Sequence, residues 1–276
     1  MELISPPYRL KFFHGLGDVV VFRNILNLLE GPIELQLNRR LGQAALFHND
    51  PKVTVVEGPI DDDRFSNVNF LMQFTRECQT GTATKGRVCL EHEFGIKQPD
   101  FAFRPIPFTQ LDNFTNEHTD ATERFLEGVD NYVVCHFQGT SNPKGQNPPE
   151  SFAERSIIRF LEAGYYVIVI NYDYVFHHSG NRDFGIVDQD RVRSTYQRLP
   201  MQVESLWTLI RGAKAFYGVD SGPLHLALCS QTPCTYIHHS TRFLESFYDE
   251  GLEDLPVVDA VKESAIPHSL IPTYPG

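Results

Sequence analysis

The stretch from 215 to 228, Ala-Phe-Tyr-Gly-Val-Asp-Ser-Gly-Pro-Leu-His-Leu-Ala-Leu, constrains the fold of this chain more than any other. It predicts a buried strand that ends at Asp220 and a helix that begins at Pro223. Ser221 is a favoured N-cap, Gly222 allows a tight turn, and Pro223 suits a first helical turn because its missing N–H needs no partner there. Open α/β sheets bind ligands at such strand ends, and helix N-termini favour phosphate. We therefore expect Asp220, Ser221, Gly222 and Pro223 to hold a diphosphate.

The same junction is also explained by an ordinary helix start, which every α/β protein contains. His225 distinguishes the two interpretations, because a polar ring stands in the first turn among Leu224, Leu226 and Ala227. An imidazole at that position can donate a hydrogen bond to a phosphate or a sugar hydroxyl. We therefore include His225 among the expected binding residues.

Composition limits the class of partner. The chain has 276 residues, 41% of them hydrophobic, and a formal net charge of −11. This length suits two ordinary domains or one large one, and the acidic balance disfavours a nucleic-acid partner. A local cluster of basic residues keeps that partner open as an alternative: Arg39, Arg40, Lys85 and Arg87.

The N-terminus, Met-Glu-Leu-Ile-Ser-Pro-Pro, resembles no signal peptide, and no apolar run is long enough to cross a membrane. We expect a cytoplasmic protein without a transmembrane segment, and a peripheral association with the inner membrane remains an alternative. Five cysteines are present and none forms a Cys-x-x-Cys pair, so we expect free thiols.

Apolar strand patterns alternate with helical patterns along most of the chain, which favours parallel α/β sheets. Strands are expected at 8–13, 33–37, 53–56, 132–137, 165–172, 215–219 and 235–237, and helices at 19–29, 39–47, 109–126, 150–161 and 203–211. Residues 58–108 follow no clear pattern. Gly128-Val-Asp-Asn131 is the expected boundary between an N-terminal domain, 1–130, and a C-terminal domain, 131–276.

The loop 138–147, Gln-Gly-Thr-Ser-Asn-Pro-Lys-Gly-Gln-Asn, is longer than most connections between a strand and a helix. It is rich in small hydrogen-bonding residues and carries one cation. We expect Ser141 to bind the donor and Lys144 to neutralise a departing diphosphate. A solvated surface turn is the alternative.

Gly15-Leu-Gly-Asp18 follows the first expected strand and leads into an apolar helix. Gly17 is expected to approach the donor, and Asp18 is placed where a carboxylate can take a proton from a hydroxyl. A carboxylate there is also stabilised by the helix dipole, so a purely capping role for Asp18 remains open.

No metal site is expected. The doublets His177-His178 and His238-His239 lack the spacing of zinc ligands, and Asp61-Asp-Asp63 is typical of a solvated acidic surface.

Four segments together resemble the heptosyltransferase family, glycosyltransferase family nine. They are Gly17-Asp18, Lys144 with Pro148-Pro-Glu-Ser-Phe-Ala153, Glu204-Ser-Leu-Trp-Thr-Leu-Ile-Arg-Gly-Ala213, and Asp220-Ser-Gly-Pro-Leu-His-Leu-Ala227. The resemblance is strong over 131–237 and thin before it, and Phe22-Arg23-Asn24 departs from the family's usual Thr-x-Pro helix start. It implies the GT-B architecture, in which two Rossmann-like domains with parallel sheets face a cleft.

By the same resemblance, Asp18 takes the place of the catalytic base, Lys144 contacts donor phosphate, and the donor is a nucleotide-sugar rather than a bound cofactor. The implied reaction is sugar transfer to an acceptor hydroxyl, inverting and without a metal. The acceptor is a glycan or another hydroxyl-bearing molecule, with a modified nucleic-acid base as an alternative. Two further alternatives are a non-catalytic protein that binds a nucleotide-sugar or glycan, and a sugar-nucleotide epimerase.

Overall fold

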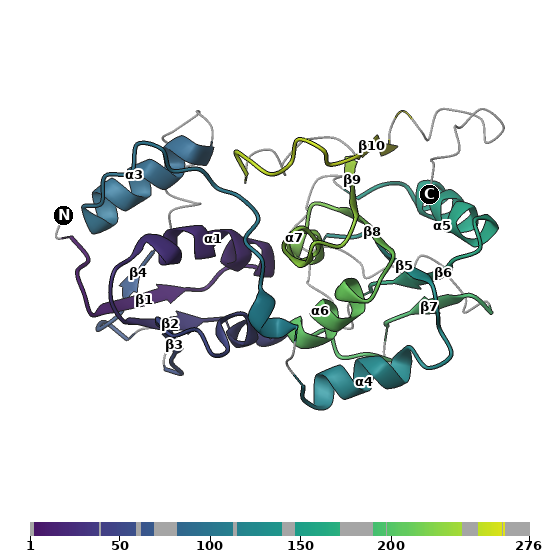
Figure 1. The fold of residues 1–276 in the computed structure, drawn as a ribbon, viewed down its shortest axis with the longest axis horizontal. Coiled ribbons are helices and arrows are strands. Elements are labelled where there is room, and N and C mark those ends of the chain that lie inside the picture. The colour runs from purple at the N-terminus through teal and green to yellow at the C-terminus, as the bar shows by residue number, and fades with distance from the viewer. Residues whose placement is uncertain are drawn as a thin grey trace. The chain divides into compact units, whose positions relative to one another are not determined.

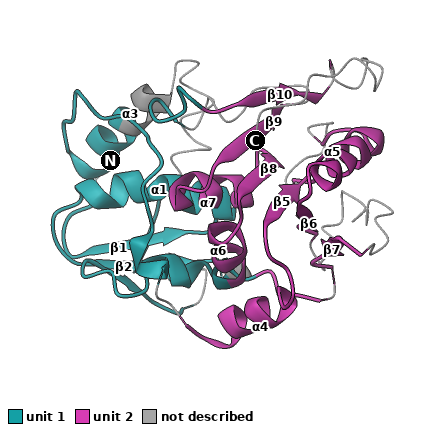
Figure 2. Ribbon diagram, turned by 45° about the vertical axis from the view of Figure 1, so that its right-hand side comes forward, with its two compact units in different colours: residues 1–114, 202–204, 243–254 teal, residues 115–201, 205–242, 255–276 magenta. Residues whose placement is uncertain are grey.

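A computed structural model describes ten segments of the chain: 3–38, 40–58, 62–68, 82–112, 115–139, 147–171, 190–196, 198–238, 248–260 and 262. The chain divides into two compact units, coloured separately in Figure 2. Unit 1 comprises Met1–Phe114, Gln202–Glu204 and Phe243–Asp254, and unit 2 comprises Thr115–Met201, Ser205–Arg242 and Leu255–Gly276. The assignment of 1–130 to an acceptor domain and 131–276 to a donor domain stays a prediction.

Unit 1 is built on a parallel sheet whose described strands run in the order β3-β2-β1-β4 (Figure 1). The strands are β1 (Tyr8–Phe12), β2 (Ile33–Leu37), β3 (Val53–Val55) and β4 (Ser66–Asn67). The helices are α1 (Leu16–Leu28), η1 (Arg40–Phe47), α3 (Thr82–Phe94) and η2 (Thr109–Leu111), of which η1 and η2 are 3₁₀ helices.

Alternation along β1 decides which face of this sheet is apolar. Tyr8, Leu10 and Phe12 are buried, whereas Arg9 is exposed and Lys11 is half-buried. The side chains of Phe12 and Phe22 stack with their ring centroids 4.1 Å apart, which packs α1 against the apolar face.

The departure Phe22-Arg23-Asn24 has a structural explanation. Asn24 is buried in α1, and its carboxamide donates to the carbonyl of Arg104 and accepts from the N–H of Arg104. The Arg23 guanidinium lies 4.2 Å from the Phe108 ring centroid and donates to the Pro107 carbonyl. These residues attach the segment after α3 to the side of α1, so they serve the packing of unit 1.

A late segment of the chain also belongs to unit 1. Asp249 donates its backbone N–H to the Phe103 carbonyl, at 2.8 Å, and its carboxylate accepts from the Phe103 N–H, at 2.9 Å. Residues close to the C-terminus therefore complete the packing of the N-terminal unit.

Unit 2 is a larger parallel sheet whose described strands run in the order β10-β9-β8-β5-β6-β7. The strands are β5 (Tyr132–His136), β6 (Tyr166–Val169), β7 (Val192–Ser194), β8 (Ala215–Val219), β9 (Cys234–His238) and β10 (Val257–Asp259). The helices are α4 (Glu117–Phe125), α5 (Glu150–Glu162), α6 (Val203–Arg211) and α7 (Gly222–Ser230). All residues of β5 are buried, as expected of a central parallel strand covered on both faces.

The α/β class and the parallel sheets predicted from the sequence are confirmed, and strands 33–37 and 215–219 and helix 203–211 match residue for residue. Two expected helices differ in kind: 109–126 is a short 3₁₀ turn followed by α4, and 39–47 contains a 3₁₀ helix. Strands β7 and β10 were not predicted. No helix among the described residues is long and apolar enough to cross a membrane.

Candidate functional site at the start of α7

The candidate site lies at the carboxyl ends of β5 and β8. Strand β5 has β6 on one side and β8 on the other, so the chain progresses in opposite directions from β5. Ligands of open α/β sheets bind at this kind of switch point, outside the carboxyl ends of the strands. Helix α7 begins directly after β8, and its N-terminus therefore lies at the position where a ligand is expected.

The side chain of the N-cap residue does not cap the N-terminus of α7. Ser221 occupies the N-cap position in an extended conformation, with φ −168° and ψ 169°, but its hydroxyl makes no capping hydrogen bond. The first helical hydrogen bonds run from the N–H groups of Leu224 and His225 to the Ser221 carbonyl, at 3.0 and 3.2 Å. Pro223 has no N–H, and the Gly222 N–H lies before the first residue that donates within the helix. An uncapped helix start carries partial positive charge and favours an anion.

The Ser221 hydroxyl points back to the sheet. It donates to the Val219 carbonyl at 3.1 Å and lies 2.8 Å from Nδ1 of His136, the last residue of β5. His136 is fully buried, and this burial lowers the pKa of its imidazole to about 3. The ring is therefore neutral at pH 7.

Asp220 and His225 form a second pair at this junction. Nε2 of His225 lies 3.2 Å from Oδ1 of Asp220, and the two side chains are 3% and 15% exposed. A carboxylate ahead of a helix N-terminus is stabilised by the helix dipole. The described contact of the His225 ring is with Asp220, and a contact with phosphate stays a prediction.

The predicted loop begins beside this junction. The N–H of Gly139 donates to the Asn147 carboxamide oxygen at 2.9 Å, which joins the two ends of the loop. A Cβ at Gly139 would lie 3.4 Å from the Asp220 carbonyl oxygen, so the backbones approach closely here. Ser141 and Lys144 lie outside the described residues, and their roles stay predictions.

In unit 1, the predicted base stands in the first turn of α1. Oδ2 of Asp18 accepts from the N–H of Gly15, the N-cap residue, at 3.2 Å, and lies 3.9 Å from Nδ1 of His14. Gly17 is inside the helix, one residue before Asp18. The Asp18 side chain is 31% exposed. The capping role is therefore present, while the roles of Asp18 as a base and Gly17 as a donor contact stay predictions.

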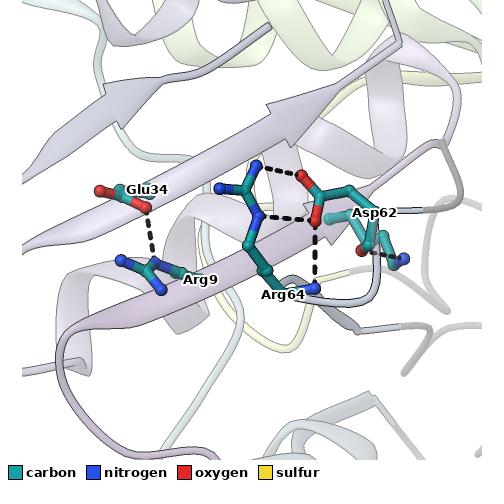
Figure 3. Close-up of polar contacts among 5 residues, drawn as sticks. Arg9, Glu34, Asp62 and Arg64 are labelled. Carbon is teal, nitrogen blue, oxygen red and sulfur yellow. Dashed lines mark hydrogen bonds and ion pairs between the residues drawn. The ribbon is translucent and has the colours of Figure 1, made fainter. Parts of the chain in front are cut away.

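In the acidic run before β4, Asp62 is paired with an arginine. Asp62 accepts two hydrogen bonds from the Arg64 guanidinium, at 2.9 and 2.7 Å, and these bonds lower the pKa of the carboxyl to about 2 (Figure 3). Arg9 and Glu34 pair across β1 and β2 at 2.9 Å. Among the described residues, no group of three or more histidine, cysteine or acidic side chains is arranged to hold a metal ion. Asp61, His177, His178 and His239 lie outside those residues.

The sequence patterns did not single out His136. The available signal was a histidine at the end of an apolar strand, directly before the Gly-containing loop. Its importance depends on β5 and β8 being neighbours in the sheet, and they are separated by a long stretch of sequence.

The fold is that of the GT-B glycosyltransferases, with two Rossmann-like units of parallel sheet and helix. Three similar solved structures come from the family predicted above. A family 9 glycosyl transferase from Veillonella parvula is 11% identical, with a TM-score of 0.59, and the match covers 95% of this chain and 88% of that one. The E. coli ADP-heptose lipopolysaccharide heptosyltransferase II is 10% identical, with a TM-score of 0.55 and coverages of 91% and 90%.

The third structure is E. coli heptosyltransferase WaaC with ADP-2-deoxy-2-fluoro heptose, which is 14% identical, with a TM-score of 0.55 and coverages of 93% and 100%. No protein-family model and no curated protein matches the sequence. The resemblance stated from the sequence is thus supported at the level of the fold.

Proposed function

We propose that this protein is a glycosyltransferase that moves a sugar from a nucleotide-sugar donor to an acceptor hydroxyl. The observation that carries the proposal is the uncapped N-terminus of α7 at the switch point of unit 2. The fold adds support, because a similar solved structure, WaaC, holds an ADP-sugar analogue.

The donor diphosphate is assigned to the start of α7. Backbone N–H groups at Ser221 and Gly222 would donate to phosphate oxygens, and the Ser221 hydroxyl does not compete for them as a cap. Lys144 would add a positive charge as the diphosphate leaves. Such donors accelerate a reaction when they stabilise charge that develops in the transition state.

Asp18 is assigned as the base. Its carboxylate would accept the proton of the acceptor hydroxyl while the hydroxyl oxygen forms a bond to the anomeric carbon. The bond from that carbon to the donor phosphate breaks, and the nucleoside diphosphate leaves with the electron pair. A single displacement of this kind inverts the anomeric centre. No step in this scheme requires a metal ion.

The acceptor is assigned only by class, as a hydroxyl group on a glycan or a comparable molecule. The net charge of −11 disfavours a nucleic-acid acceptor. Of the basic residues that favour it, Arg87 donates to the Pro99 carbonyl, and the side chains of Arg39, Arg40 and Lys85 lie outside the described residues.

Melting temperature in the presence of nucleotide sugars tests the proposal. ADP-, UDP-, GDP- and CMP-sugars would be compared with the corresponding free monophosphates, because a ligand that binds the folded state raises the melting temperature by mass action. We expect one nucleotide diphosphate series to raise it and the monophosphates to act more weakly.

The donor found in this way would then be incubated with the protein and a set of glycan acceptors, and release of the nucleoside diphosphate would be measured. Release of the nucleoside diphosphate together with transfer of the sugar to an acceptor supports the proposal. Binding without transfer or hydrolysis supports the non-catalytic alternative, and conversion of the donor sugar supports the epimerase. If no nucleotide sugar binds, the proposed function is wrong.

A further inference from the structure

One hydroxyl proton fixes the protonation of the buried ring at the end of β5. Ser221 Oγ is 3.1 Å from the Val219 carbonyl oxygen and 2.8 Å from Nδ1 of His136. A carbonyl oxygen accepts only, so the Ser221 proton must point at Val219 if that hydrogen bond is made. The same proton cannot also point at His136.

Both hydrogen bonds form only if Nδ1 of His136 carries a proton and donates it to Ser221 Oγ. In the opposite arrangement Ser221 donates its only hydroxyl proton to Nδ1, and the hydrogen bond to the Val219 carbonyl is lost. In a buried site the arrangement with more hydrogen bonds is favoured. Burial lowers the pKa of the ring, and a smaller opposite effect comes from the backbone of Gln138, whose carbonyl accepts a hydrogen bond from a ring N–H.

We infer that His136 is a positioning residue for the donor site: as a neutral Nδ1–H imidazole it holds the Ser221 hydroxyl against β8 and so keeps the N-terminus of α7 open. Serine is among the strongest N-capping residues, and Ser221 already stands at the N-cap position. Without His136, the hydroxyl would turn and bond to the N–H groups of the first turn. It would then compete with the diphosphate of the ligand.

This inference rests on the proposed function for its consequence but not for its geometry. A serine that caps its own helix contributes about 0.5 to 2 kcal/mol, which corresponds to about 2- to 30-fold in an equilibrium constant. Loss of the imidazole should therefore weaken nucleotide binding by about fivefold, even though His136 makes no contact with the nucleotide in this scheme.

A double-mutant cycle tests the competition. Affinity for the nucleoside diphosphate identified above is measured by calorimetry for the parent, His136→Leu, Ser221→Ala and the double variant. We expect His136→Leu to weaken binding about fivefold, and to change it less than twofold when Ser221→Ala is already present, because no hydroxyl remains to cap the helix. An equal loss from His136→Leu in both backgrounds would overturn the inference, since it would indicate a general structural role.

His136→Asn provides the matched control. A carboxamide N–H can stand close to the position of Nδ1–H and donate to Ser221. We expect this variant to recover most of the affinity lost in His136→Leu. Equal losses in the asparagine and leucine variants would contradict a role for the donated hydrogen bond.

The tautomer is tested on the unmodified protein, so the inference can be judged even if a variant fails to fold. Two-bond ¹H–¹⁵N spectra of the labelled chain at pH 7 distinguish the tautomers, and His136→Asn identifies the resonances of this ring. A neutral Nδ1–H ring supports the inference, and an Nε2–H or charged ring overturns it. If the Nδ1–H ring is found but no nucleotide binds, the proposed function fails while the hydrogen-bond geometry stands.

Discussion

The N-termini of α1 and α7 make an informative comparison. Both helices follow a parallel strand of a Rossmann-like sheet, and both start near a glycine. At α1, the carboxylate of Asp18 accepts from the Gly15 N–H, so the helix start is occupied by the protein's own negative charge. At α7, the Ser221 hydroxyl is turned toward Val219 and His136 and does not cap the helix.

Either helix start could in principle bind an anion or present a proton acceptor. The different groups at the starts of α1 and α7 indicate which helix suits which role. The Asp18 carboxylate at α1 repels an anion, whereas the half-buried start of α7 lacks a capping bond from Ser221 and favours one. The Asp220 carboxylate that precedes α7 is paired with the His225 ring at 3.2 Å. This difference agrees with the proposed roles, a donor diphosphate at α7 and a proton acceptor at α1. Four predictions test this division of roles.

The largest effect is expected at α1. Asp18→Asn removes the proton acceptor but keeps an oxygen that can accept from Gly15, so turnover should fall by about 10²–10⁴ while nucleotide affinity and melting temperature stay near the parent values. Initial rates of sugar transfer, with calorimetry for the donor, measure this.

Asp18→Ala is the companion variant. It should lose the same activity and about 1 kcal/mol of stability in addition, because the cap is also removed. Nearly full activity in Asp18→Asn would move the base elsewhere, and His14 is then the next candidate.

The next effect is expected at α7. Gly222→Val places a branched side chain where the backbone must approach phosphate, so affinity for the nucleoside diphosphate should fall about 10- to 100-fold, the value of about one hydrogen bond to a charged group. Gly15→Ala is the control at α1, where the added Cβ would make only an ordinary contact, 3.4 Å from Asp18 Oδ2. Equal losses in the two variants would remove the distinction between the junctions.

A smaller effect is expected from Lys144→Ala. If this lysine supplements the α7 dipole as the diphosphate leaves, turnover should fall about tenfold, with little change in acceptor affinity, because the interaction strengthens in the transition state. Lys214→Ala, at an exposed lysine of the same unit, controls for the change in net charge. A change confined to acceptor KM would argue against this role.

The smallest effect concerns stability and pH. The pKa of His136 is about 3 in the folded protein, below its unfolded value near 6.5, so the unfolded chain binds a proton first as the pH falls. The contribution of the neutral His136 ring to the free energy of unfolding is complete above pH 6.5 and is lost progressively as the pH falls to about 3. From pH 7.0 to 5.5 the parent should lose about 1.3 kcal/mol that His136→Asn does not lose, measured by urea unfolding. Equal losses would show that His136 is not held neutral.

Much of unit 2 could be predicted from the sequence because its strands are short apolar runs bounded by clear turn residues. The helix 203–211 and the strand 215–219 were placed without error for this reason. The junction at 220–225 was also identified, since its cap and proline signals are local.

Other features could not be predicted because they depend on distant partners. Strand β4 has only two residues and is defined by pairing with β1, so it has no pattern of its own. The orientation of the Ser221 hydroxyl depends on His136, which comes from another strand. A good N-cap residue was recognised, but only the structure shows that it does not cap.

The bonds between Asp249 and Phe103 bear on how this chain could be recombined with proteins of similar fold. A gene fusion joined near residue 130 would take its first half from one parent and its last residues from another. The N-terminal unit would then receive a foreign partner for Phe103. Chimaeras should fold more often when residues 248–254 are transferred together with the N-terminal half. A single crossover near residue 130 is therefore a poor design for this chain.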